Sequence, residues 1–528
     1  MAQSKFSLPY NAAYYPGDWV RPRVNPGDWT PIIDTTETFN GHRVADRQGV
    51  YNLYDAPIGV RLKIEEANKS EPVLKAEKEW EGKGQLEASA VWKEDGHYHM
   101  ICNAGATFLS PPRTCYAVSK DAYKWTRAAV GQVEFQGSTY NNIIGNSPGG
   151  GILDDPKAPA EERFKVMAEE GYWFDPDKGE EVSAKEAEKR WAAGEYQGPA
   201  YKGPRVELRG RLVGWTSPDR LNWKRIEKPL GEFPSDGGGA PYYDPDTDTY
   251  FAYLRVHGLP PEGPIGIGTG LPEIGIVRRA IGFTKTKDFR HWPPAKLVLH
   301  PDAEDGLDTA FYGCTYFPYP GRNDLHGMFV EAYHHVTDHV DSHIAFSRDG
   351  LLWTRPEHRA IIPLGPTGSG EDCTVYPCES PLIELPDGYW GLAYSGMSAL
   401  HNQAGEWPLP GQISWARWQP HRLCGLEAEA EGRFTIPTVQ RRSTQLRLNY
   451  RCKPGGWIKL ELLHAVPSWV HPDVDPAAGF TFEQSDRLTG DSLDQIVTWN
   501  GKSDISSVGD MVAIRVKMYK AKLFAYKT

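Results

Sequence analysis

A seven-residue pattern, Ser/Thr-x-Asp-x-x-x-Trp, occurs four times in this chain. The copies span 119–125, 217–223, 286–292 and 347–353, and each follows a run rich in β-forming residues (TCYAVS, GRLVGWTS, RRAIGFTKT and SHIAFS). The Asp can accept hydrogen bonds from the backbone N–H groups of its own turn, and the Trp can cover the hairpin that the turn closes. The pattern therefore predicts a repeated strand–turn–strand fold.

A second recurring unit lies upstream of these turns. An apolar strand, an acidic or Gly-containing turn and an aromatic strand recur as ASAVWKEDGHYHMIC, GGGILDDPKAPAEERFKVMA, APYYDPDTDTYFAYLR, TYFPYPGRNDLHGMFVEAY and SPLIELPDGYWGLAYSG. Five units of roughly 60 residues, each with three or four strands, predict a five-bladed β-propeller, because radial stacking buries faces that a lone sheet leaves exposed. We expect residues 58–63 (IGVRLK) to add an outer strand that closes the ring.

Two further segments complete the predicted all-β organisation. Residues 183–193 open with Ser183 at an N-cap position and are rich in helix formers, which predicts one short helix in an insertion at about 165–205. From about residue 421, alternating strands with Gly, Asn and Asp turns predict a β-sandwich. We therefore expect a propeller over 1–420, with an N-terminal arm over 1–50, and a β-sandwich over 421–528.

Charge and composition exclude several classes of partner and site. The net charge is −11, and Lys and Arg are dispersed, whereas nucleic-acid binding needs a basic stripe. There is no apolar run of about 18 residues, so no membrane span is expected. The N-terminal segment lacks the regions of a signal peptide, which predicts either a cytoplasmic protein or a periplasmic or secreted one whose signal peptide has been removed. The seven cysteines include no CxxC pair, and we expect no metal or other cofactor.

The abundance of aromatic residues, 18 Trp and 26 Tyr, suits the binding of sugar rings as well as a propeller core. Hydrolysis of a glycosidic bond needs two carboxyl groups that flank it, so acids just before the first apolar strand of each unit are the candidates. We predict that Glu87, Asp236 and Glu379 form the catalytic group, with one glutamate acting as the acid through a pKa raised by burial and neighbouring charge. Asp308 and Asp372, in the same register, are predicted to bind sugar hydroxyls.

Four other residues are predicted to contact the substrate. Asn142 lies in the one unit that offers no acid in this register, and its amide could bond sugar hydroxyls. Tyr312 follows the predicted hydroxyl-binding acid of the fourth unit. His334 and His335 are adjacent on a strand and face opposite ways, so they cannot both point into one site. The spacing of the neighbouring histidines does not indicate a metal.

The chain resembles a group of bacterial proteins identified as family-32-like glycoside hydrolases. The resemblance rests on SPDRLNWKR, YYDPDTDTYFAYLR, FYGCTYFPYPG, AFSRDGLLWTRP with IIPLGPTGSGED, ARWQPHRL and the C-terminal GDSLDQIVTWNGKSDISSVGDMVAIRVKMYKAKLFAYKT. It implies a five-bladed propeller with an appended β-sandwich. Family 32 enzymes carry W-M-N-D-P-N-G, R-D-P and E-C motifs, for which only 54–59 (YDAPIG) and the pair Cys378-Glu379 offer echoes here. No catalytic residue is transferred, and fructoside specificity is not implied.

The residues and the resemblance together predict an exo-acting glycoside hydrolase that releases a terminal sugar from an oligo- or polysaccharide. Two alternatives stay open: a non-catalytic propeller that binds glycans, and a polysaccharide lyase that uses Tyr or His as its base. The predicted partner is a carbohydrate in each case. The sequence does not fix an oligomeric state.

Overall fold

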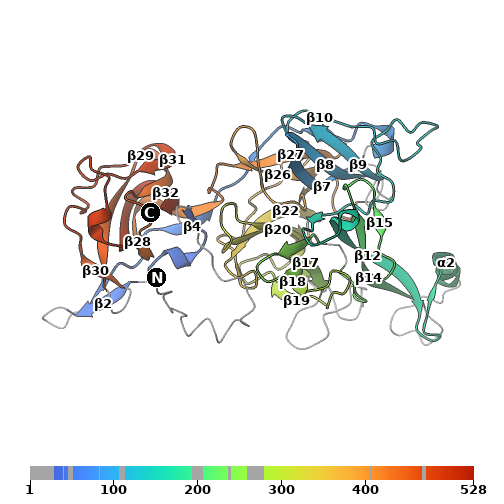
Figure 1. Cartoon of the computed structure of the whole chain (residues 1–528), viewed down its shortest axis with the longest axis horizontal. Helices are drawn as coiled ribbons and strands as arrows, with labels where there is room; N and C mark the ends of the chain where they lie inside the picture. The colour runs from blue at the N-terminus through green and yellow to red at the C-terminus, as the bar shows by residue number, and fades with distance from the viewer. Residues whose placement is uncertain are drawn as a thin grey trace.

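The computed structural model describes residues 29–39, 41–45, 51–82, 84–105, 113–192, 206–235, 239–257, 279–403, 407–466 and 471–528. Within these ranges the chain is almost entirely β-structure, with one α-helix and a few short 3-10 turns. Two bodies lie side by side, one built from β7 to β27 and the other around β28, β29 and β32 (Figure 1). No described helix is both long and apolar enough to cross a bilayer.

The larger body begins with three separate antiparallel sheets, which we name units 1 to 3. Unit 1 comprises β7 (Gln85–Glu94), β8 (His97–Gly105), β9 (Arg113–Ser119) and β10 (Trp125–Thr126). Unit 2 comprises β11 (Leu153–Asp154), β12 (Phe164–Asp175), β13 (Glu180–Val182), β14 (Glu207–Ser217) and β15 (Lys224–Arg225). Unit 3 comprises β16 (Pro241–Asp244), β17 (Thr249–His257), β18 (Arg279–Thr286) and β19 (Lys296–Leu299).

Units 4 and 5 are joined in one ten-stranded sheet by a single parallel bridge between Val340 and Thr374. Unit 4 comprises β20 (Thr309–Pro318), β21 (His326–His334), β22 (His339–Ser347) and β23 (Trp353–Thr354). Unit 5 comprises β24 (Thr374–Pro377), β25 (Ile383–Glu384), β26 (Trp390–Met397) and β27 (Gln412–Trp418). The five hairpins expected from the sequence therefore correspond to five successive groups of strands.

The outer strand of unit 5 comes from the N-terminal part of the chain. It is formed by β5 (Asn68–Lys69) and β6 (Leu74–Lys75), which both pair with β27. The prediction that residues 58–63 play this part is wrong, because β4 (Arg61–Ile64) pairs instead with β28 of the smaller body. The alternation in 58–63 indicated a strand correctly but could not say which sheet receives it.

The Ser/Thr-x-Asp-x-x-x-Trp turns connect the last two strands of each of units 1 to 4, and their Asp side chains accept hydrogen bonds as predicted. Asp121 Oδ1 accepts the N–H groups of Tyr123 and Lys124 at 2.9 and 2.7 Å. Asp219 and Asp349 accept the equivalent pairs, and Asp288 accepts one N–H at 2.9 Å. In each copy the Trp Nε1–H donates to the carbonyl three residues earlier, so the ring folds back over its turn.

The smaller body is one seven-stranded hydrogen-bonded sheet around its own core. Its members are β1 (Thr30–Pro31), β4, β28 (Cys424–Gln440), β29 (Arg447–Val466), β30 (His471–Pro476), β31 (Asp491–Ile496) and β32 (Met511–Lys527). Because β1 pairs with β32, this part of the N-terminal arm belongs to the smaller body and not to the propeller assigned to 1–420. Asp55, in the echo of the family 32 motif, accepts hydrogen bonds from Arg515 and Thr435 and is a structural residue here.

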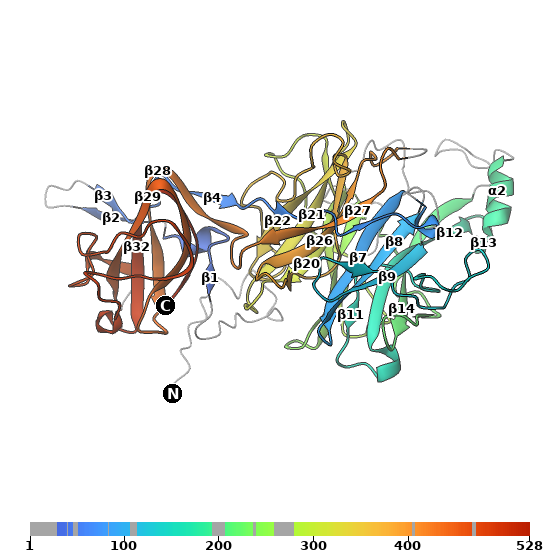
Figure 2. The same cartoon turned by 90° about the horizontal axis from the view of Figure 1, so that it is seen from above.

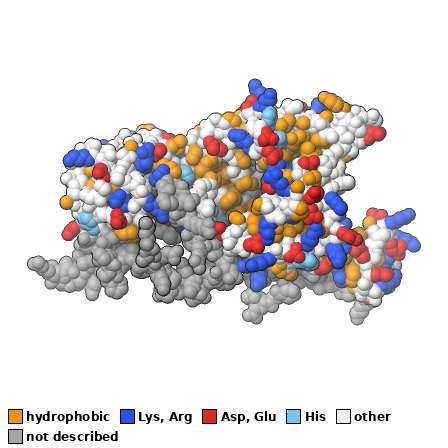
Figure 3. Space-filling model, in the orientation of Figure 1, with side chains coloured by type: hydrophobic (Ala, Val, Ile, Leu, Met, Phe, Trp, Pro, Cys, Tyr) orange, Lys and Arg blue, Asp and Glu red, His pale blue; other side chains and the backbone are white. Residues whose placement is uncertain are grey.

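The two bodies meet through a shared apolar cluster. Ile33 and Ile64 pack there with Phe317 and Trp418 of units 4 and 5. At the far end of the molecule the long hairpin of β12 and β14 projects outward and carries α2 (Ala184–Ala192) (Figures 1 and 2). The predicted helix is thus present, and Glu186 N–H donates to Ser183 Oγ at 3.2 Å. Acidic and basic side chains are intermixed over the visible face (Figure 3).

Candidate functional site: a cluster of three glutamates

Three glutamates from different units gather in the larger body, and we call them the carboxyl cluster. Glu87 lies near the start of β7, Glu331 lies in β21, and Glu379 follows the end of β24. Each is only partly accessible to solvent. Glu379 acts electrostatically on both Glu87 and Glu331, and Glu87 acts on Glu331, so the three carboxyl groups share one environment.

The backbone that holds Glu379 is a run of three glycines, 149–151, just before β11. Gly151 N–H donates to Glu379 Oε2 at 2.6 Å. A Cβ at Gly151 would lie 2.6 Å from the carbonyl oxygen of Glu379 and 2.3 Å from Cβ of Ala240, and one at Gly149 would lie 2.4 Å from the amide of Asn103. Only glycine permits this close approach, which fixes the carboxylate between units 2 and 5.

Glu331 reaches the cluster from the second strand of unit 4 because the first strand has a gap in its side chains. Glu331 pairs with Gly313 of β20, next to an irregularity between Phe311 and Gly313. A Cβ at Gly313 would lie 2.3 Å from Glu331 Oε2. The glycine therefore leaves the space that the Glu331 carboxyl group occupies.

Burial and crowding raise the pKa of all three carboxyl groups. Desolvation, opposed by Arg255 and aided by the charges of Glu379 and Glu87, raises the pKa of Glu331 to about 8. Desolvation, opposed by a hydrogen bond with the Gln85 side chain and aided by the charge of Glu379, raises the pKa of Glu87 to about 7. It also raises the pKa of Glu379 to about 7, although the Gly151 N–H and Arg255 favour its ionised form. The cluster therefore holds protons at neutral pH, when ordinary carboxyl groups are ionised.

An arginine and an aromatic ring complete the site. The Arg255 guanidinium, from β17, lies 3.7 Å from the centre of the Tyr312 ring, and Arg255 Nε–H donates to the Tyr312 carbonyl. The Tyr312 ring is 4.5 Å from the ring of His401 and 6.1 Å from that of Tyr376. Tyr376 and His401 are joined by a 3.0 Å hydrogen bond. A second guanidinium, that of Arg279, lies 5.1 Å from the centre of the same Tyr312 ring, so the arrangement combines proton-holding carboxyl groups, two cations and aromatic rings.

The structure brings together two of the three predicted catalytic acids, Glu87 and Glu379, whereas Asp236 lies outside the described residues. Asp308 precedes β20, and its Oδ2 accepts the Val336 N–H at 3.1 Å, so it holds the turn between β21 and β22. Asp372 Oδ2 accepts the Gly368 N–H at 2.8 Å, and its Oδ1 is buried without a hydrogen bond. Hydroxyl binding by these two aspartates stays a prediction.

The prediction for Asn142 needs correction. Its side chain is 1 % exposed, its Oδ1 accepts from Trp80 Nε1–H at 2.8 Å, and its Nδ2–H donates to the Tyr116 carbonyl at 2.8 Å. The amide is therefore committed to the protein interior. His334 pairs with Asp341 at 3.3 Å, while the ring of His335 lies 4.5 Å from that of Tyr333.

Sequence reasoning missed Glu331 and Arg255, because it searched only the starts of first strands. Both lie in second strands, where an alternating pattern places side chains between units and not at their inner edge. The available signal for Glu331 was a lone Gly within the aromatic strand TAFYGCTYFP, paired with a charged residue inside the apolar run MFVEAY.

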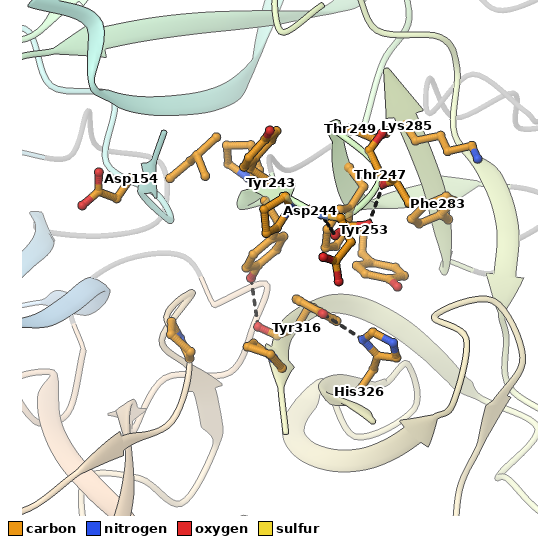
Figure 4. A pocket seen from close by; sticks show the side chains of 18 of the residues that line it. Asp154, Tyr243, Asp244, Thr247, Thr249, Tyr253, Phe283, Lys285, Tyr316 and His326 are labelled. Carbon is orange, nitrogen blue, oxygen red and sulfur yellow. Dashed lines mark hydrogen bonds between the residues drawn. The ribbon is translucent and has the colours of Figure 1, made fainter. Parts of the chain in front are cut away.

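A separate cavity of about 430 Å³ lies between units 3 and 4, and Figure 4 shows its lining. Tyr253, Phe283 and Tyr316 are among the residues that line it. A 2.9 Å hydrogen bond joins His326 Nδ1 to the Tyr316 hydroxyl. Tyr242 lines this cavity, and the charge of Glu379 acts on the Tyr242 hydroxyl. Glu87, Glu331 and Glu379 do not line the cavity, so the cavity and the carboxyl cluster are distinct.

No protein-family model matches the sequence, and no curated protein matches it either. Among solved structures, a thermostable family-43 glycoside hydrolase aligns with 67% of this chain and 92% of its own, at 13% identity and a TM-score of 0.40. Sucrose-6-phosphate hydrolase from Lactobacillus gasseri covers 84% of this chain and 91% of its own, at 9% identity and a TM-score of 0.37. An N-acetylgalactosamine deacetylase from F. plautii covers 76% and 96%, at 12% identity and a TM-score of 0.36.

Proposed function

We propose that this protein is a glycoside hydrolase whose reaction takes place at the carboxyl cluster of Glu87, Glu331 and Glu379. The observation that carries the proposal is the gathering of three partly accessible carboxyl groups, all with raised pKa values, from units 1, 4 and 5. Glycoside hydrolysis needs one carboxyl group that gives a proton to the leaving oxygen and one ionised group that acts as nucleophile or base. In this proposal the five units are the blades of a propeller, and the C-terminal body is a β-sandwich.

The environments of the three glutamates suggest their roles. Glu331 has the highest pKa, about 8, so it keeps its proton at neutral pH and is assigned as the acid. Glu379 accepts the Gly151 N–H and lies near Arg255, which both favour its carboxylate, so it is assigned as nucleophile or base. Glu87 has no such donor from the main chain and is assigned to share a proton with Glu379 and to bind a hydroxyl.

One feature supports an exo-acting enzyme that binds a chain end. Glu87, Glu331 and Glu379 are only partly accessible to solvent, and a recessed site of this kind admits the end of a glycan chain more readily than its middle.

The test begins with a screen of aryl glycosides and of plant and algal oligosaccharides, scored by sugar release. Single changes Glu87→Gln, Glu331→Gln and Glu379→Gln should then lower kcat/KM by at least about 100-fold, because each removes a proton-transfer group or nucleophile. Glu384→Gln, an exposed change in β25, is the matched control and should leave kcat/KM unchanged. Activity that survives in all three cluster variants would refute the proposal.

The two alternatives predict different results in the same screen. A glycan-binding protein would retain sugars without releasing products. A lyase would produce unsaturated ends that absorb in the ultraviolet. The lyase is disfavoured because burial raises the pKa of Tyr376 well above its usual value, so its hydroxyl is poorly suited to act as a base.

A further inference from the structure

A second group of chemically active side chains lies on the opposite face of unit 4 from Glu331. His334 of β21 and Asp341 and His343 of β22 share one face, because Ala332 pairs with Asp341 and strand residues alternate. Other residues of this face, Met328, Val330 and Ala345 among them, pack against unit 3. The group is therefore separate from the carboxyl cluster.

The separations within this group fit ligands around one ion. His334 Nε2 lies 3.3 Å from Asp341 Oδ2, and His343 Nε2 lies 3.1 Å from Asp341 Oδ1. One ligand atom from each residue lies within 4.8 Å of the others. Ligands at about 2.0–2.2 Å from a shared ion are roughly 3.0–3.6 Å apart, whereas charge-assisted hydrogen bonds are shorter, about 2.7–2.9 Å.

Two polar atoms of the group lack hydrogen bonds. Asp341 Oδ1 accepts none, although His343 Nε2 is near it, and His343 Nδ1 has no partner. His343 is only 4 % exposed. Buried polar atoms are nearly always satisfied in folded proteins, so the unsatisfied Asp341 Oδ1, which lies beside His343 Nε2, indicates a missing partner at this point.

A neighbouring cluster shows the contrast. Asp302, Asp305 and His358 are also close together, but Arg355 donates to Asp305 Oδ1 at 2.7 Å and to Asp302 Oδ2 at 2.9 Å. The Arg355 guanidinium therefore already supplies the positive charge that a metal ion would bring to these aspartates. Within the described part of the chain, Asp341 has only histidines as ion-pair partners.

We propose that His334, Asp341 and His343 bind one divalent transition-metal ion, with Zn²⁺ as the expected occupant. Two imidazole nitrogens and one carboxylate oxygen form a ligand set that suits Zn²⁺ and leaves a position for water. Because the ligands come from both strands of the β21–β22 hairpin, the ion ties together the strands next to Tyr333. Its role is to stabilise this end of unit 4.

The test uses the full chain, without a polyhistidine tag, after treatment with a chelator and dialysis against Zn²⁺. Metal analysis should find about one Zn²⁺ per chain, and Zn²⁺ should raise Tm. The double change His334→Ala/His343→Ala should weaken binding by at least about 100-fold and abolish the Tm shift. His358→Ala, from the cluster neutralised by Arg355, should behave as wild type.

A wild-type chain that binds no Zn²⁺, or equal binding in the double variant, would overturn the proposal. Should the double variant fail to fold, Co²⁺ added to the wild-type chain decides the matter. A tetrahedral site with imidazole ligands gives strong visible absorption, whereas the weak absorption of hydrated Co²⁺ would refute the site.

Discussion

At the scale of single residues, the carboxyl cluster depends on the space that glycines leave because they have no side chain. Gly313 makes room for the Glu331 carboxyl group, and Gly151 lets a backbone N–H reach Glu379. These glycines have no reactive group, but they determine the positions of the Glu331 and Glu379 carboxyl groups. The raised pKa values follow from that placement, because three carboxyl groups are crowded where water is scarce.

The space at Gly313 yields a first prediction. Gly313→Ala would put a Cβ 2.3 Å from Glu331 Oε2, so the carboxyl group must move away. We expect kcat/KM on the sugar substrate to fall by about 100-fold, because small misplacements of catalytic groups are costly, with only a modest change in Tm. Gly145→Ala is the control, since its Cβ would meet ordinary contacts at 3.6 Å or more. Equal activity in the two variants would contradict the assignment.

The pKa of Glu331 yields a second prediction, on stability. In the folded protein Glu331 holds its proton up to about pH 8, whereas the unfolded chain loses it near its ordinary pKa of 4.5. The folded state therefore loses stability as pH rises from about 4.5 to about 8. Glu331→Gln should raise the free energy of unfolding by on the order of 2 kcal/mol at pH 8 and much less at pH 4.

Denaturant unfolding at both pH values measures this difference. Glu384→Gln, on the surface, should show no such dependence. A Glu331→Gln variant whose stability gain is the same at pH 4 and pH 8 would show that Glu331 titrates normally.

At the scale of elements, the Asp turns could be predicted most directly from the sequence. Their hydrogen bonds join residues two or three positions apart, so a local pattern is enough to predict them. The outer strand of unit 5, formed by β5 and β6, could not be predicted in this way. Asn68–Lys69 and Leu74–Lys75 are too short to alternate, and their partner β27 lies more than three hundred residues away. Pairing over such a separation is set by the assembled sheets.

The same distinction separates the acids. Glu87 and Glu379 stand at the start of a first strand or just after one, a position that a sequence register marks. Glu331 could not be predicted as a site residue because the space for its carboxyl group is left by Gly313 of another strand. Asn142 was misassigned because its hydrogen-bond partners, Trp80 and Tyr116, are distant from it in the sequence.

The turns also yield a third prediction. Asp219→Ala should lower the free energy of unfolding by about 1 kcal/mol at pH 7, because two turn N–H groups lose their acceptor. These bonds, opposed by desolvation, keep the pKa of Asp219 below its usual value, so the loss should shrink as pH falls below about 4. Asp177→Ala, at an exposed hairpin residue, is the control. A loss as large in Asp177→Ala would contradict this reading of the turn.

At the scale of the whole molecule, four strand groups deliver side chains to a common place that none of them could build alone. Glu87, Glu331 and Glu379 come from units 1, 4 and 5, and Arg255 comes from unit 3. The smaller body packs against units 4 and 5, the same two units that supply Glu331 and Glu379. The proposed activity is therefore a property of the assembled units.

The pH dependence of kcat/KM on the released sugar tests this account most directly. Because the acid must hold its proton and the nucleophile or base must be ionised, the profile should be bell-shaped, with limbs near pH 7 and pH 8 that belong to the coupled cluster. Glu331→Gln should abolish the limb near pH 8 in its residual activity. A single limb near pH 4.5, or an alkaline limb unchanged in Glu331→Gln, would contradict the central claim.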